Sequence, residues 1–214
     1  KYGVWKINRE IMMKNIIKAI KDAELVFVEI GSEMQMKLSR LKEIPNFAEK
    51  LDFLEKHTEW EYLIPYLIRY YLKKEYHPEI SRAYDKLVEL LERKNYFVIS
   101  LSTDDLLKYS ALKPERVAFP CGTYDKLQCI ENCKNELYEI DETFWNSVVS
   151  WIENKTAIKE IRKPICPVCG KELVFNQYGQ PVYNEEGYLD NWKIYTQWLQ
   201  GTVNKKLCIL ELGV

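Results

Sequence analysis

The sequence has no long apolar run and no excess of either charge. No apolar stretch approaches the roughly 18 consecutive residues that a membrane-spanning helix needs, so a membrane protein is not indicated. The 214 residues include 31 Lys and Arg against 32 Asp and Glu, giving a formal net charge of −1. Because no basic stripe accompanies this balance, a dedicated nucleic-acid-binding protein is also disfavoured.

Histidine is scarce, which limits the chemistry that the chain can perform. His57 and His77 are the only two histidines. His57 lies at a charged helix end and is expected to be exposed. His77 precedes Pro78 at the start of a helix, where a structural polar contact is the simpler interpretation. Neither position indicates an activating base for a nucleophile.

Cysteine, in contrast, is concentrated, because five of the six cysteines lie between Phe119 and Gly170. Two pairs occur there, one spaced Cys-x₃-Cys and one reading Cys-Pro-Val-Cys-Gly, a turn that directs two thiolates to one point. A structural zinc ion is predicted, with four unrelated buried thiols or a redox Cys-x-x-Cys as alternatives. The expected ligands are Cys129, Cys133, Cys166 and Cys169. A site closed by four cysteines has no open position and should stabilise structure without catalysing a reaction.

Free thiols in this arrangement fit a reducing compartment, so a cytoplasmic protein is expected. The sixth cysteine, Cys208, lies inside an apolar run and is expected to be a small core residue. Because that run stops just before Val214, we also expect the native chain to continue beyond this residue.

Apolar periodicity predicts an α/β fold. Three short apolar runs, 25–30, 96–101 and 207–212, are typical of buried strands in a parallel sheet, and the last is expected to be central. Helices are expected near 8–23 (capped by Asn8), 32–41, 44–76, 79–94, 103–110, 141–155 and 188–200. The resulting architecture is a Rossmann-like parallel sheet with helices on both faces, plus a helical insert and a small zinc-binding lobe. The expected boundaries are 1–40, 77–118 and 176–214 for the Rossmann-like lobe, 41–76 for the insert and 119–175 for the zinc-binding lobe.

The insert is rich in aromatic residues, among them Trp60, Tyr66 and Tyr71. Such residues could form a stacking surface for bases, but a base-binding surface also needs a basic patch, which is missing here. We therefore expect them to form the core of a helical layer.

Three stretches of the chain resemble the sirtuins. Residues 23–31 resemble the first strand and its glycine-rich NAD loop. Residues 96–104 resemble the strand that the family usually ends in Thr-Gln-Asn-x-Asp, and 120–124 with Cys129 resemble the His-Gly segment before the first zinc cysteines. The resemblance is greatest to the bacterial branch associated with macrodomains, in divergent form.

The resemblance implies an NAD-dependent protein deacylase or ADP-ribosyltransferase that acts on an acylated or ADP-ribosylated protein. By position, Asp104 is retained, Ser102 replaces the family's asparagine and Cys121 replaces its general-base histidine. These three are the candidate catalytic residues. The candidate NAD-binding residues are Gly31, Ser32, Ser100, Asp104 and Gly213. The resemblance gives no oligomeric state.

Departures from the family pattern predict a weakened site. Glu29, Ile30 and Glu33 surround Gly31, where the family has a glycine-rich loop. Each carboxylate close to the pyrophosphate would cost about 1–4 kcal/mol, so NAD affinity should fall by roughly tenfold to a thousandfold. Three hypotheses remain: an active sirtuin-like enzyme with weak or lost deacylation, a catalytically inactive binding or regulatory partner, and a zinc-stabilised protein that uses Cys121 as a nucleophile.

Overall fold

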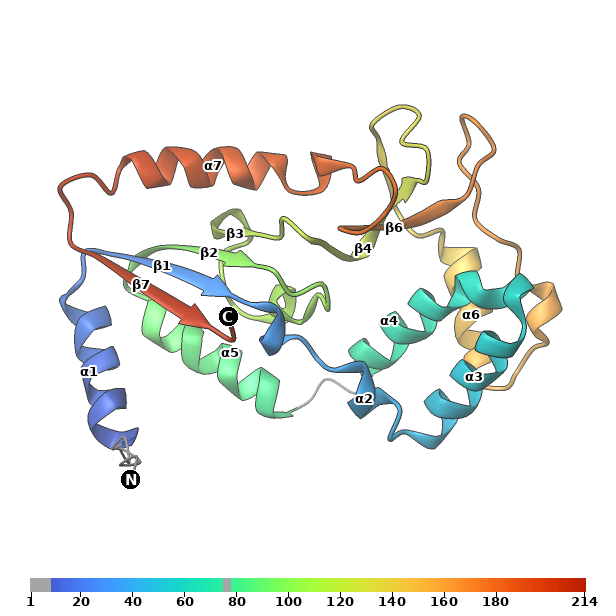
Figure 1. Cartoon of the computed structure of the whole chain (residues 1–214), viewed down its shortest axis with the longest axis horizontal. Helices are drawn as coiled ribbons and strands as arrows, with labels where there is room; N and C mark the ends of the chain where they lie inside the picture. The colour runs from blue at the N-terminus through green and yellow to red at the C-terminus, as the bar shows by residue number, and fades with distance from the viewer. Residues whose placement is uncertain (1–8, 75–77) are drawn as a thin grey trace, which may run out of the picture.

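The computed structural model describes residues 9–74 and 78–214, in two β-sheets with helices packed around them (Figure 1). Asn8 and His77 lie outside these residues. The strands are β1 (Leu25–Ile30), β2 (Asn95–Ser100), β3 (Val117–Ala118), β4 (Gly122–Cys129), β5 (Leu137–Tyr138), β6 (Leu173–Gln177) and β7 (Leu207–Leu212). The α-helices are α1 (Arg9–Asp22), α2 (Leu38–Leu41), α3 (Pro45–Lys56), α4 (Ile64–Lys74), α5 (Pro78–Leu91), α6 (Glu142–Ile152) and α7 (Leu189–Gln200). Short 3₁₀-helices are η1 (Ser32–Met34), η2 (Thr58–Leu63), η3 (Leu106–Tyr109), η4 (Pro114–Arg116), η5 (Ile158–Glu160) and η6 (Glu185–Gly187).

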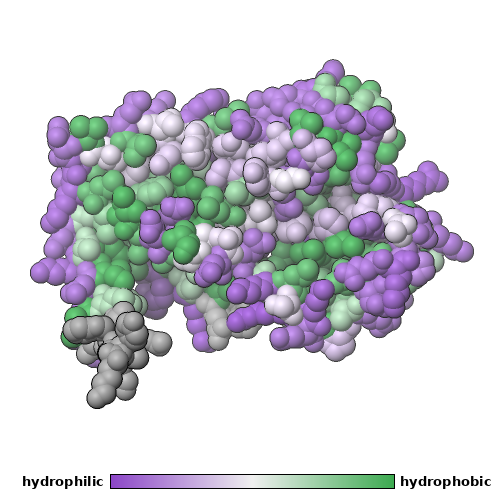
Figure 2. All heavy atoms as spheres, in the orientation of Figure 1, coloured by the Kyte–Doolittle hydropathy of each residue, from purple (hydrophilic) through white to green (hydrophobic). Residues whose placement is uncertain are grey.

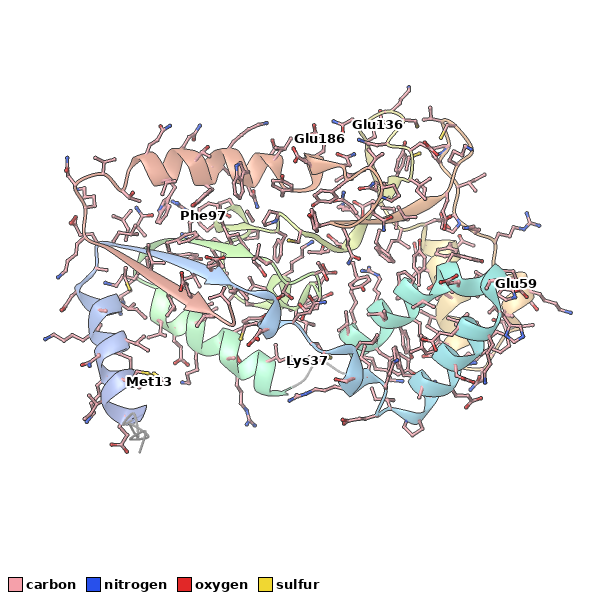
Figure 3. All side chains as sticks on the ribbon, viewed as in Figure 1. Met13, Lys37, Glu59, Phe97, Glu136 and Glu186 are labelled. Atoms are coloured by element: carbon pink, nitrogen blue, oxygen red, sulfur yellow. The ribbon has the colours of Figure 1, made fainter. Side chains whose placement is uncertain are left out.

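The larger sheet is parallel, in the order β3-β2-β1-β7. Successive side chains of β1 point to opposite faces of the sheet. Val26 and Val28 pack in a core that includes residues of α1 and α5, and Leu25 packs in a second core with Phe97 and Trp198. Helices therefore cover both faces, with α7 on the side opposite α5 (Figure 1). Phe97 lies between the sheet and α7 (Figure 3). The predicted Rossmann-like architecture is confirmed.

The position of β7 differs from the expectation. β7 runs parallel as predicted, but it pairs only with β1 among the described residues and is therefore an edge strand. Ile209 is 60% exposed there, and Figure 2 shows hydrophobic residues on this side of the molecule. Periodicity detects a buried-type strand but says nothing about how many neighbours the strand has. Cys208, expected in the core, is half-buried and packs against the main core.

The helical layer of α3, η2 and α4 has an aromatic core, as predicted. Phe47 and Tyr71 are almost fully buried, with ring centroids 5.3 Å apart in an edge-to-face arrangement. Tyr66 is also buried and packs against Phe175 of β6 at 4.7 Å. His57 is exposed at the end of α3, as expected.

The smaller sheet is antiparallel, in the order β5-β4-β6. The run Glu-Leu-Val-Phe at 172–175 predicts a short strand, and β6 lies there. In contrast, β4 reads Gly-Thr-Tyr-Asp-Lys-Leu-Gln-Cys and carries an irregularity between Gly122 and Leu127 that interrupts a two-residue apolar period. The helix expected over 32–41 is instead η1 and α2, and that over 103–110 shortens to η3 after a left-handed Asp105. No helix among the described residues is long and apolar enough to span a membrane.

Candidate functional site

The four predicted zinc ligands converge on one point. All four Sγ atoms lie within 4.8 Å of one another, with Cys129–Cys169 at 3.5 Å and Cys133–Cys166 at 3.7 Å. Four sulfurs around one zinc at about 2.3 Å lie about 3.8 Å apart, so this donor set fits a tetrahedral zinc ion. The zinc interpretation of the sequence is therefore supported by geometry, and the alternative of four unrelated thiols is wrong.

Local backbone structure explains the convergence. β4 ends at Cys129, and the turn from Cys166 closes through a bond from the Gly170 N–H to the Cys166 carbonyl at 2.9 Å. Gly170 has φ +71°, a conformation that favours glycine. Burial alone would raise the pKa of the Cys166 thiol. Hydrogen bonds from the backbone N–H groups of Cys169 and Val168 and from the Tyr138 hydroxyl outweigh this effect and lower the pKa to about 6. Such donors stabilise a thiolate, the form that binds zinc.

The candidate NAD-binding residues lie at the carboxyl edge of the parallel sheet. Gly31 follows β1, Gly213 follows β7, and the Gly31 N–H donates to the Leu212 carbonyl at 2.8 Å. A Cβ at Gly31 would overlap the Gly213 carbonyl, so glycine is required there by packing. The Glu33 N–H donates to that same carbonyl at 3.1 Å. Two backbone donors that could bind a phosphate are therefore already bonded to the end of β7.

Asp104 joins the loops that follow β1 and β2. Its Oδ2 accepts the Met36 N–H at 2.9 Å, and its Oδ1 accepts the Leu106 N–H at 3.1 Å. Beside it, Ser102 Oγ accepts the Asp104 N–H at 3.4 Å, and the Ser102 N–H donates to Ser100 Oγ at 3.3 Å. All three side chains are buried. The hydrogen bonds that these side chains accept from the backbone therefore fix the loops. They leave the side-chain oxygens with limited capacity to accept further bonds from a ligand.

Cys121, the third candidate catalytic residue, lies on the connection between β3 and β4. Its carbonyl accepts the Tyr178 N–H at 2.8 Å, which ties it to the end of β6. Gly122 beside it has φ +71° and lies against the Asn176 carbonyl. Burial raises the pKa of the half-buried Cys121 thiol, so the neutral form prevails at neutral pH.

The Cys121 pKa leads to a direct prediction. Because only the thiolate reacts with iodoacetamide, the alkylation rate of Cys121 should keep rising above about pH 8.5, the ordinary cysteine pKa. Peptide mass spectrometry at increasing pH measures this rate. A plateau below pH 8.5 would contradict the burial effect.

A cluster of four charged side chains and one hydroxyl lies beside Asp104 and was not predicted from the sequence. The charged members are Arg69, Asp105, Lys108 and Asp125, and the hydroxyl is that of Thr123. Two adjacent aspartates at the end of a buried strand were the only available signal. The cations come from distant or helical segments whose relation to them is set by tertiary structure.

No protein-family model matches the chain. A Staphylococcus aureus protein ADP-ribosyltransferase is 22% identical over 212 residues, which cover 92% of this chain and 67% of that protein. A probable bifunctional ADP-ribose hydrolase/ADP-ribosyltransferase of Fusarium oxysporum f. sp. cubense is 25% identical over 122 residues, or 55% of this chain and 20% of that protein. Among solved structures, a sirtuin from work on substrate affinity matches with a TM-score of 0.52 and 18% identity, over 92% of this chain and 76% of that one.

A parallel sheet with helices on both faces and an attached four-cysteine unit defines an α/β protein with a module whose geometry suits a metal ion. The structural match then gives the particular class: the fold is sirtuin-like, in divergent form, as the resemblance of the sequence predicted.

Proposed function

We propose that this protein is a sirtuin-like NAD-dependent ADP-ribosyltransferase with weakened or lost deacylase activity. The observation that carries the proposal is the sirtuin-like sheet, whose carboxyl edge holds Gly31, Asp104 and Gly213 together. Both relatives named above have ADP-ribosyltransferase in their names, which supports transfer of ADP-ribose over deacylation. An acylated or ADP-ribosylated protein is the proposed partner, and zinc the proposed structural ion.

The residues fit NAD poorly at the phosphate end. The Gly31 N–H is bonded to the carbonyl of Leu212 at the end of β7, and the Glu33 N–H to that of Gly213 just after it. In addition, η1 is a three-residue helix that offers no extended row of donors. This observation favours a second candidate function, a sirtuin-fold binding or regulatory partner without catalysis.

Calorimetric titration with NAD separates the two candidates. For the enzyme we expect a dissociation constant of about 0.1–1 mM, equivalent to about −5.5 to −4 kcal/mol. Incubation with labelled NAD and an unfractionated protein mixture should then transfer label. Absence of both heat and label transfer leaves the non-catalytic candidate.

Removing charge from the loop should tighten NAD binding. The sequence points to both Glu29 and Glu33, but Glu29 projects to the α7 face, beside Tyr195. Glu33 is exposed on η1 and should supply most of the repulsion. We expect the Glu29→Gly, Glu33→Gly double variant to bind about tenfold more tightly at low salt, which is about 1.4 kcal/mol.

Glu33→Gln alone should give most of that gain, and Glu29→Gln is its matched control. Calorimetry at two salt concentrations checks the result, since screening by salt should reduce the gain. An unchanged affinity in the double variant at low salt would show that the occupied backbone donors, rather than charge, limit binding.

A further inference from the structure

A cluster of charged side chains connects three separate parts of the molecule beside Asp104. Lys108, on η3 after β2, donates from Nζ to Thr123 Oγ1 at 3.1 Å and to Asp125 Oδ2 at 2.9 Å, both on β4. Its Nζ also lies 3.8 Å from Asp105 Oδ1. The parallel sheet is thereby joined to the small antiparallel sheet by one side chain.

Arg69 extends the cluster to the helical layer. It projects from α4, with Nη1 3.8 Å from Asp105 Oδ2, and it also donates to the Tyr124 carbonyl on β4. Its guanidinium lies 5.1 Å from the ring centroid of Trp145 on α6, a cation–π contact. The Arg69 side chain is only 12% exposed. Each cation therefore contacts more than one part of the fold.

Asp105 is the costly member of the cluster. Its side chain is 4% exposed, and its backbone adopts φ +66°, a left-handed conformation that non-glycine residues other than asparagine and aspartate rarely adopt. Burial raises the pKa of Asp105, although the charges of Lys108 and Arg69 oppose the rise. For Asp125, burial also acts upward, but the hydrogen bond and charge of Lys108 prevail and lower its pKa.

A buried charged group is weak evidence for stability, since apolar residues often stabilise as well or better. The cluster is therefore better explained by the geometry that it imposes. Lys108 lies four residues after Asp104, and Thr123 lies two residues after Cys121. The bond between Lys108 and Thr123 consequently links the two loops that carry the candidate site.

We propose that Lys108, supported by Arg69, is a positioning residue that holds the segment after Cys121 against the loop that carries Ser102 and Asp104. The two halves of the candidate site are thereby kept at a fixed separation. The inference rests on the proposed function only in taking these residues as the site. Its physical content, a contact that fixes Thr123 two residues after Cys121, does not depend on catalysis.

Alkylation of Cys121 tests the inference without an activity assay. Lys108→Met removes the charge and keeps the chain length, and should raise the iodoacetamide reaction rate of Cys121 about threefold to tenfold, which corresponds to about 0.7–1.4 kcal/mol. Peptide mass spectrometry reports each cysteine separately, so Cys208 on β7 measures general loosening. Its rate should stay unchanged. Lys126→Met, which removes an ion pair from β4 to Glu139, the residue after β5, is the matched control.

Equal Cys121 rates in Lys108→Met and Lys126→Met would overturn the proposal. So would parallel increases at Cys121 and Cys208, because Lys108 would then support the fold as a whole. If Lys108→Met does not fold, Thr123→Val removes the hydroxyl that accepts from Lys108 with a smaller change, and an unchanged ratio of Cys121 to Cys208 rates would overturn the proposal. Absence of NAD turnover in every variant contradicts the proposed function and leaves the alkylation ratio to decide on Lys108.

Discussion

Replacing Cys166 with serine should release zinc and unfold the small antiparallel sheet. A structural four-cysteine site contributes apparent binding free energies of about 10–16 kcal/mol in small zinc modules, more than the entire stability of most domains. The sheet has only three strands, two of which contact each other through two residue pairs, so little else holds β5 in place. Cys166 is one of the two buried cysteines of the site and also accepts several hydrogen bonds, so its replacement removes these bonds together with one thiolate.

Metal analysis of the purified parent should show one zinc per chain, and the Cys166→Ser variant should show little. Hydrogen exchange should accelerate across β4, β5 and β6 while β1 and β2 stay protected, because one face of β1 and β2 packs on the core around Phe97 and Trp198, which includes neither Cys129 nor Cys166. Cys208→Ser, which removes a thiol outside the site, is the control and should retain zinc. Less than about half an equivalent of zinc in the parent would contradict the site.

Apolar runs were sufficient to locate β1, β2 and β7, because the sequences of all three stay largely apolar along their length, as is typical of parallel strands. They could not show that β7 lies at an edge, since neighbours are a property of the sheet. The cysteine ligands were found because a metal requires particular residue types at a particular spacing.

The remaining site depends on contacts between distant segments. Arg69, Asp105 and Asp125 lie far apart in the sequence, on α4, on the loop after β2 and on β4. No local pattern relates them. Likewise, the occupied N–H of Glu33 depends on where β7 ends in space. Such features follow from tertiary packing, so only a structure shows that the phosphate end of the candidate site is partly filled.

The chemistry of the candidate site depends on what can accept a proton. A general base contributes about 10²- to 10⁴-fold when it reaches the proton and has a matched pKa. Burial raises the pKa of Cys121, so its neutral thiol is a poor acceptor at pH 7. Ser102 Oγ already accepts the Asp104 N–H, and both oxygens of Asp104 accept backbone N–H groups. The present residues therefore orient one another better than they activate a ribose hydroxyl.

We accordingly expect the parent to deacylate an acyl-lysine peptide with NAD far more slowly than about 1 s⁻¹, the lower end of the usual range of enzyme turnover. Cys121→His supplies a base of ordinary pKa near 6.5 and should accelerate deacylation by up to about 10²-fold. Cys121→Ala is the control and should match the parent, because a neutral thiol contributes little as a base. NAD hydrolysis should change less in all three, since it needs no base at a ribose hydroxyl.

A parent deacylation rate of about 1 s⁻¹ or more would show that a group other than Cys121 serves as the base. Equal, negligible rates in all three would favour the non-catalytic partner, because a restored base cannot act where the cofactor does not bind.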